Sequence, residues 1–141
     1  MQSNFSIIIL AFALLLMKGS FVGAFHQDIY QPRVPFELLE EIQDIDNPYP
    51  SSSERLKIGK KIYFGKGLCV TCHGNDGKGK KLPGHSPRDF TDKKWQQLRT
   101  DGEIMWILKN GSPGTEMPIR VGKVIDEEEA RKLFKNPGIT A

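Results

Sequence analysis

The chain has 141 residues, of which 38% are hydrophobic and 26% are charged. This length excludes two full-size domains, and the composition is that of a soluble globular protein apart from the first stretch. The charge is segregated, because residues 25–54 carry seven acidic residues and one basic residue (net −6), whereas residues 55–100 carry twelve basic and three acidic residues (net +9).

Residues 1–24 are predicted to be a secretory signal peptide. The apolar run from Phe5 to Met17 has thirteen residues, which at about 1.5 Å each do not cross a hydrocarbon core of about 30 Å. Val22-Gly23-Ala24 is a suitable cleavage site. The run is not preceded by Lys or Arg, so a retained membrane anchor stays open as the alternative. Either way, we expect export to a bacterial periplasm, where free thiols are unusual and nucleic acid is not a partner.

Residues 25–50 are predicted to form an acidic extension punctuated by prolines. It contains one short helical piece, in which Phe36, Leu39 and Ile42 share a face. Two interpretations are open at this point. The extension is a solvated linker that folds back on the domain, or its apolar face docks on a partner subunit.

Residues 51–141 are predicted to form the main domain, which begins with a helix. Ser51 is expected to be the N-cap of this helix and Glu54 the N3 residue of a capping box. Glycine inside a helix costs about 1 kcal/mol relative to alanine, so we expect a structural reason for Gly59. The expected buried face consists of Leu56, Gly59, Ile62 and Tyr63.

The stretch "CVTCH" holds both cysteines of the chain, Cys69 and Cys72, followed by His73. A disulfide across so short a loop adds little stability and leaves the histidine unexplained. A zinc site needs further ligands at metal spacing, which the chain lacks, and a redox dithiol needs a βαβ context. CxxCH in an exported protein is typical of covalent haem attachment. One helical turn then carries both thioether sulfurs, and His73 follows as the proximal iron ligand.

A loop rich in glycine and lysine and then two helices are expected after this motif. The second helix, "TDGEIMWILKNG", has a capping box of Thr100 and Glu103 and a stop at Asn110-Gly111. Its predicted buried stripe is Ile104, Ile107 and Leu108, which leaves Met105 in the core or on the surface. The candidates to wall a haem are Phe90, Trp95, Trp106, Ile107 and Leu108.

A second iron ligand has four candidates outside the signal: Met105, Met117, His26 and His85. Met117 lies in the Gly/Pro-rich loop "GSPGTEMPI" and has no helical stripe to join. The simpler interpretation of such a residue is a methionine that packs on an aromatic ring. Ligation by His85 would give a bis-histidine haem of lower potential.

The last helix is predicted to begin after Asp126. This residue is a suitable N-cap, and Glu129 follows three positions later. Its apolar face is expected to consist of Ala130, Leu133 and Phe134. The helix is expected to stop at Asn136-Pro137-Gly138.

From about Ser51 to Phe134 the chain resembles the class I cytochromes c, which are small monohaem proteins. "CVTCHG" and "GTEMP" are the specific stretches, and "GKKIYF" and "PRDFTD" support them. The resemblance implies an all-α fold of about four to five short helices wrapped around one covalently bound haem c. It also implies that Met117 is the distal iron ligand.

The resemblance further implies two packing features. The ring of His73 donates to a proline carbonyl, for which Pro87 is the first choice and Pro83 the second. The first and last helices cross closely, at a position that Gly59 and Tyr63 fit.

A haem bound by both His73 and Met117 has no open position for a substrate. The resemblance therefore implies a periplasmic one-electron carrier between respiratory redox partners, and not an enzyme. We expect the basic block to meet an acidic patch on these partners. The lysines of this block that flank the haem motif are Lys57, Lys60, Lys61, Lys66, Lys78, Lys80 and Lys81.

Two alternatives remain open. The chain is a fixed haem subunit of a larger respiratory complex, tethered by the extension or by a retained signal. Otherwise it is a five-coordinate protein that binds ligands or reacts with peroxide, which the mid-chain position of Cys69 disfavours.

Overall fold

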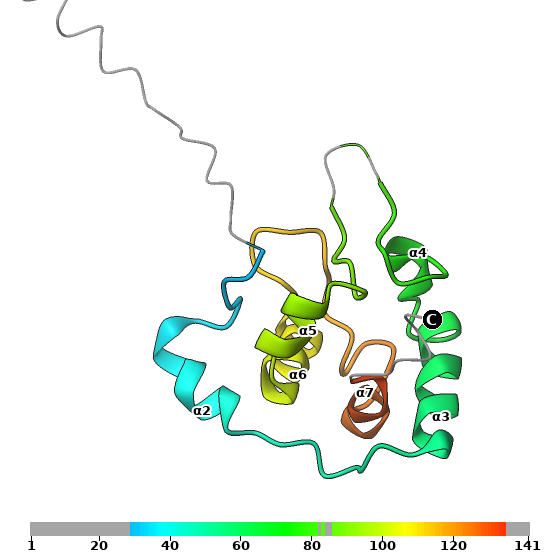
Figure 1. Ribbon diagram of the computed structural model, residues 1–141, viewed down its shortest axis with the longest axis horizontal. Helices are drawn as coiled ribbons and strands as arrows, with labels where there is room; N and C mark the ends of the chain where they lie inside the picture. Colours follow the sequence, from blue (N-terminus) through cyan, green and yellow to red (C-terminus); the bar gives the residue numbers. More distant parts are fainter. Residues whose placement is uncertain (1–28, 82, 84–85, 135–141) are drawn as a thin grey trace, which may run out of the picture.

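The computed structural model describes residues 29–81, 83 and 86–134 (Figure 1). Within these residues the chain forms six α-helices, one 3-10 helix and no strand, so the all-α prediction is confirmed. The elements are η1 (Phe36–Leu38), α2 (Leu39–Gln43), α3 (Ser53–Phe64), α4 (Val70–His73), α5 (Lys93–Leu98), α6 (Asp101–Asn110) and α7 (Glu127–Leu133). The predicted signal, the histidines His26 and His85, and the predicted stop at residues 136–138 lie outside the described residues.

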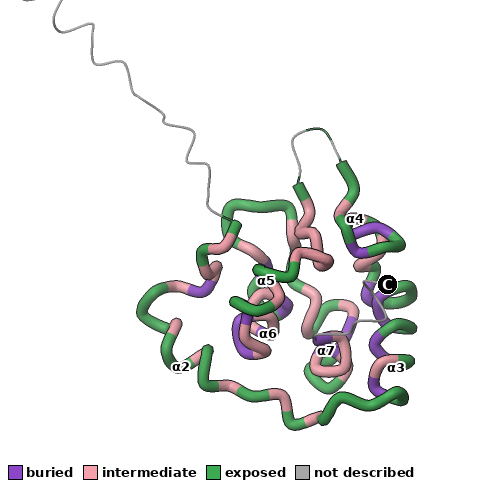
Figure 2. Tube along the Cα trace, in the orientation of Figure 1, coloured by how far each residue is buried: buried purple, intermediate pink, exposed green. Residues whose placement is uncertain are grey.

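The helices pack in a chain of neighbours, with α3 against α7, α7 against α6, and α6 against α2 (Figure 1). The predicted packing of the first helix of the domain on the last is therefore observed. The core lies where α3, α6 and α7 meet, and its buried stretches are visible in Figure 2. Its buried members are Ile62, Met105, Leu108, Ile125, Ala130 and Phe134.

The N-cap of α3 is Ser52, whose Oγ accepts a hydrogen bond from the backbone N–H of Arg55 at 3.1 Å. The prediction of Ser51 as N-cap and Glu54 as N3 is therefore wrong by one residue. Three consecutive serines offer the same capping chemistry, so the local sequence does not select one of them. The predicted face is largely correct, because Gly59, Ile62 and Tyr63 are buried, while Leu56 is half-buried.

The caps of α6 and α7 agree with the sequence. Both helices begin with a reciprocal capping box, formed by Thr100 and Glu103 in α6 and by Asp126 and Glu129 in α7. Gly111 ends α6 in the left-handed region at φ 77°. These features are set by hydrogen bonds between near neighbours, which is why the local pattern predicted them.

The buried stripe of α6 differs from the prediction. Met105 and Leu108 are buried, whereas Ile104 and Ile107 are only half-buried. Compared with the predicted orientation, α6 is rotated about its axis, because it packs on both α7 and α2. Met105, at 4% exposure, belongs to the core, which was one of its two predicted positions.

The extension folds back on the domain, as the linker interpretation predicts. Val34 is buried, and α2 packs on α6 at Gly102, where an added Cβ would lie only 1.8 Å from the carbonyl oxygen of Ile42. The predicted apolar face is wrong at one position, because Phe36 is 91% exposed. The chain enters α2 through the tighter turn of η1, which turns this ring away from the face that α6 covers.

Candidate functional site

The helix α4 brings the three residues of the CxxCH motif onto one turn. Cys69 is its N-cap, and the backbone N–H of His73 donates to the carbonyl of Cys69 at 2.9 Å. Both thiols are free and half-buried, and the His73 side chain is buried. The turn therefore presents two sulfurs and one imidazole from five consecutive residues.

Glycines shape the approach to this turn. An added Cβ on Gly67 would lie 2.7 Å from the carbonyl oxygen of Ile62 and 3.2 Å from the Cys69 sulfur. Gly65 is similarly close to the carbonyl oxygen of Lys61, at 2.6 Å. The chain can double back from α3 to α4 only because these positions have no side chain, and so the glycines place Cys69 beside the end of α3.

The ring of His73 is fixed by a backbone carbonyl. Its Nδ1 lies 3.1 Å from the carbonyl oxygen of Arg88. The predicted acceptors were the carbonyls of Pro87 and Pro83, and both choices are wrong. The carbonyl of Pro87 instead points at Gly79, where an added Cβ would lie 2.4 Å from its oxygen. The chain at Pro87 passes so close to Gly79 that the carbonyl of the next residue, Arg88, faces the imidazole of His73.

The environment keeps His73 neutral. Burial is the main reason that its pKa is lowered, and the positive charges of Arg120 and Arg88 lower it further. The hydrogen bond to Arg88 acts in the opposite direction. A neutral ring that donates from Nδ1 to a carbonyl has the lone pair of Nε2 free for a metal.

Phe90 is the predicted wall residue that the structure brings to His73. The two rings are stacked with centroids 4.3 Å apart and planes inclined by 20°. Trp95, which is buried, lies behind Phe90 at 5.7 Å. Trp106 is half-buried on α6, and no contact places its ring beside His73.

Met117 is held in a tight loop after α6. Its side chain is half-buried and packs against the core of α3, α6 and α7. Its carbonyl accepts from the N–H of Ser112 at 3.0 Å, and its own N–H donates to the hydroxyl of Thr115 at 3.2 Å. Gly111 allows this closure, because an added Cβ there would lie 2.9 Å from the Met117 carbonyl oxygen. The loop setting predicted from the sequence is confirmed.

One hydrogen bond at the site was not predicted from the sequence. The hydroxyl of Tyr63 donates to the carbonyl of Gly74 at 2.7 Å, which ties α3 to the residue directly after His73. Burial raises the pKa of Tyr63 well above its usual value. A tyrosine on the buried face of a helix gives no signal of the carbonyl that its hydroxyl will meet, so only the fold reveals this bond.

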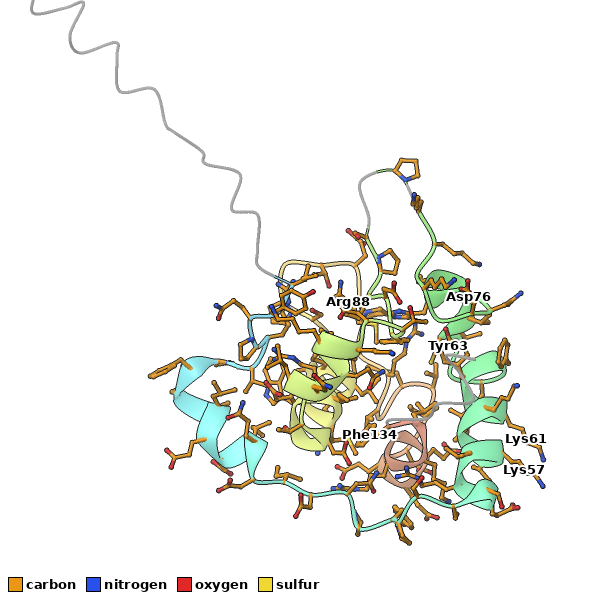
Figure 3. All side chains as sticks on the ribbon, in the orientation of Figure 1. Lys57, Lys61, Tyr63, Asp76, Arg88 and Phe134 are labelled. Carbon is orange, nitrogen blue, oxygen red and sulfur yellow. The ribbon has the colours of Figure 1, made fainter. Side chains whose placement is uncertain are left out.

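The lysines that flank the motif are all exposed in the structure. Lys57 and Lys61 project from the side of α3 that faces away from α7 (Figure 3). Lys66 differs from the other lysines of this set, because its ammonium group forms an ion pair with Glu129 of α7. In the part of the chain that the structure describes, no helix is both long and apolar enough to span a bilayer.

The donor set fits the haem attachment that the sequence predicts. Two free thiols on one turn suit two thioether bonds, and the orientation of His73 leaves Nε2 for the iron. Cys69, Cys72 and His73 would hold the group covalently and from its proximal side. The stacked Phe90 would complete that side.

Comparison with known families gives a match. The family model described as cytochrome C oxidase, cbb3-type, subunit III matches residues 54–135. This range runs from α3 to just beyond α7, so it includes the CxxCH turn and the Met117 loop and leaves out the extension. No curated protein and no solved structure was found to match the chain.

Proposed function

Because the chain belongs to the family of cytochrome c oxidase, cbb3-type, subunit III, and is thus a c-type cytochrome with covalently bound haem c, we propose that it carries single electrons between respiratory partners in the periplasm. The observation that carries this proposal is the α4 turn, which presents two free thiols and an oriented, neutral His73. When bound, the haem supplies a one-electron couple. The chain supplies its attachment, its ligands and its surroundings.

His73 is the proposed proximal ligand and Met117 the distal one. The carbonyl of Arg88 holds the imidazole in the tautomer that leaves Nε2 free, and the closed loop after Gly111 holds Met117 in place. Two ligands from the chain leave no open position for a substrate, and they stay the same in both oxidation states. Such a site moves electrons and does not make or break bonds.

Encounter with partners is proposed to involve the exposed lysines. Lys57, Lys60 and Lys61 lie on α3, and Lys78, Lys80 and Lys81 lie on the loop after the motif. A positive surface attracts and orients a partner with an acidic patch, and it raises the association rate most at low ionic strength.

Export is proposed from the leader at residues 1–24. Cleavage after Ala24 would release the mature chain into the periplasm, an oxidising compartment in which thioether bonds to haem would protect Cys69 and Cys72 from oxidation. A retained leader would instead tether the same domain to the membrane.

The optical spectrum of the purified protein tests the ligand assignment. We expect a weak near-infrared band in the oxidised form and no shift of the reduced spectrum when carbon monoxide is added. The variant Met117→Ala should lose the band and bind carbon monoxide. Met105→Leu is the matched control, because Met105 is buried in the core, and it should behave as the wild type. Ready binding of carbon monoxide by the wild type would replace the carrier with a ligand-binding or peroxidatic haem protein.

A fixed haem subunit is the second candidate function. The family description names an oxidase subunit, and the extension carries an exposed apolar ring, Phe36, next to Glu37. Affinity purification of the tagged chain from gently solubilised membranes distinguishes the two. Stable co-purification with a membrane oxidase favours the subunit, and recovery of the chain alone in the periplasmic fraction favours the carrier.

A further inference from the structure

The extension presents an aromatic ring within a negatively charged stretch of surface. Phe36 of η1 is 91% exposed, and the glutamates of η1 and α2 are exposed beside it, namely Glu37, Glu40 and Glu41. Residues 34–54 contain no lysine or arginine. We call Phe36 and these three glutamates the acidic face. Aromatic side chains are enriched where proteins meet, so this face is a candidate contact surface.

The outer side of α3 presents a surface of the opposite charge. Its members are all exposed and recur at helical spacing, so they share one side of the helix: Lys57, Lys60, Lys61 and Phe64. Lys57 and Lys61 project away from α7 (Figure 3). The ring of Phe64 is 40% exposed and is held edge-to-face against Tyr63, with centroids 5.1 Å apart. We call these four residues the basic stripe, and each surface thus combines one exposed ring with three like charges.

The charges of both surfaces lack partners within the described part of the chain. No ion pair between described residues includes a glutamate of the acidic face or a lysine of the basic stripe. Helix α7 is also acidic but differs in this respect, because Glu127, Glu128 and Glu129 each pair with a lysine. The fold therefore neutralises the carboxylates of α7 internally and leaves those of the acidic face to another molecule.

The acidic face and the basic stripe lie at opposite ends of the domain. Helix α2 packs on α6 and α3 packs on α7, with α6 and α7 between them (Figure 1). The acidic face is turned away from α6 and the basic stripe away from α7, so the two surfaces point outward in opposite directions. Two copies therefore cannot close both surfaces on each other. A contact between them is heterologous and leaves one surface of each kind free for a further copy.

We propose that copies of this chain associate head to tail, with the acidic face of one copy on the basic stripe of the next. Phe36 would pack on Phe64, and the glutamates would meet the lysines. Because Gly67 places Cys69 beside the end of α3, the extension of one copy would lie close to the CxxCH turn of the next. This inference goes beyond electron transfer with unlike partners and does not depend on which residues bind the iron.

Sedimentation velocity of the purified haem-loaded protein tests the proposal. At an ionic strength of about 0.01 M charges act over about 30 Å, and at about 1 M they act over about 3 Å. We expect the mean sedimentation coefficient to rise with protein concentration at the lower ionic strength and to fall toward the monomer value at the higher one. The assemblies should form a series of dimers, trimers and larger species, because each contact leaves both kinds of surface free at the ends.

Two variants each block one surface. Phe36→Ala combined with Glu40→Gln removes the ring and one charge of the acidic face, and Lys57→Gln combined with Lys61→Gln removes two charges of the basic stripe. Each variant alone should be monomeric at low ionic strength. An equimolar mixture should form a 1:1 dimer that does not grow, because each variant contributes one intact surface. A variant that fails to fold could not restore this contact, so the mixture also checks the folding of both.

Lys93→Gln combined with Lys123→Gln is the matched control for the lysine variant. It removes the same charge from exposed positions outside the basic stripe and should associate as the wild type does. A wild type that stays monomeric at low ionic strength would overturn the proposal and make a basic partner protein the alternative occupant of the acidic face. Association that persists in both blocked variants, or a mixture without dimers, would overturn it as well. Carbon monoxide binding by a protein that still associates would remove only the carrier function.

Discussion

The imidazole of His73 and the carbonyl of Arg88 are joined by a hydrogen bond of 3.1 Å across fifteen residues of chain. This bond orients the imidazole of His73, the proposed proximal ligand, and would increase its electron donation to a bound iron. The position of the Arg88 carbonyl depends on Gly79, which has φ +81°. Gly79 lies against the carbonyl oxygen of Pro87, the residue directly before Arg88. The loop between the motif and α5 is therefore part of the proposed iron site.

Gly79→Ala should raise the midpoint potential. The added Cβ would lie 2.4 Å from the Pro87 oxygen and would displace the Arg88 carbonyl from His73, which weakens the electron donation of the ring. Gly122→Ala is the matched control, because Gly122 has φ +77° with nothing within 4 Å of an added Cβ. Both variants should lose about 1–2 kcal/mol of stability from the left-handed backbone. Potentiometric titration that gives equal potentials for the two variants would contradict the role of this loop.

Phe134→Ala should destabilise the fold strongly, and Phe36→Ala hardly at all. Phe134 is 2% exposed in the core, and truncation of a buried phenylalanine costs about 3–5 kcal/mol. Phe36 is 91% exposed, and such a surface change costs less than about 0.5 kcal/mol. Chemical denaturation followed by circular dichroism measures both. A loss of similar size in the two variants would show that the extension, and not the core, limits stability.

Tyr63→Phe should cost about 0.5–1.5 kcal/mol, because the carbonyl of Gly74 loses its buried donor. Tyr49→Phe is the control, since it keeps the ring on which Lys132 lies, and it should cost less. The same denaturation experiment compares the two variants at neutral pH.

The stability of the wild type should also fall at high pH because of Tyr63. Its pKa is raised by burial, so the unfolded chain releases the proton near pH 10 while the folded chain retains it. The contribution of Tyr63 is then complete below about pH 10 and declines as the pH rises toward its folded pKa. Unfolding free energies of wild type and Tyr63→Phe measured across this range should converge. Parallel curves would contradict a buried, protonated Tyr63.

Gly102→Ala should detach α2 from α6. The new Cβ would lie 1.8 Å from the carbonyl oxygen of Ile42 and 3.1 Å from the Cβ of Ile45, which the gain of about 1 kcal/mol in helix propensity does not offset. Hydrogen exchange should become faster in α2 and stay slow in α3 and α7. Gln97→Ala, at an exposed position of α5, is the control and should leave α2 protected. Unchanged protection of α2 in Gly102→Ala would rule out the close contact.

Features that depend on near neighbours in the chain could be predicted from the sequence alone. The CxxCH spacing places Cys69, Cys72 and His73 on one helical turn, the capping boxes of α6 and α7 begin where predicted, and Gly111 ends α6. Each of these features joins residues at most four positions apart, so its physics is readable without the fold. The all-α class was implied by the resemblance to the class I cytochromes c, and the structure confirms it.

Features that join distant residues are set by the tertiary fold. It moved the N-cap of α3 to Ser52, turned Phe36 outward, and chose the carbonyl of Arg88 over that of Pro87. For the N-cap and for the carbonyl, neighbouring groups have equal chemistry, and only the folded chain selects one of them.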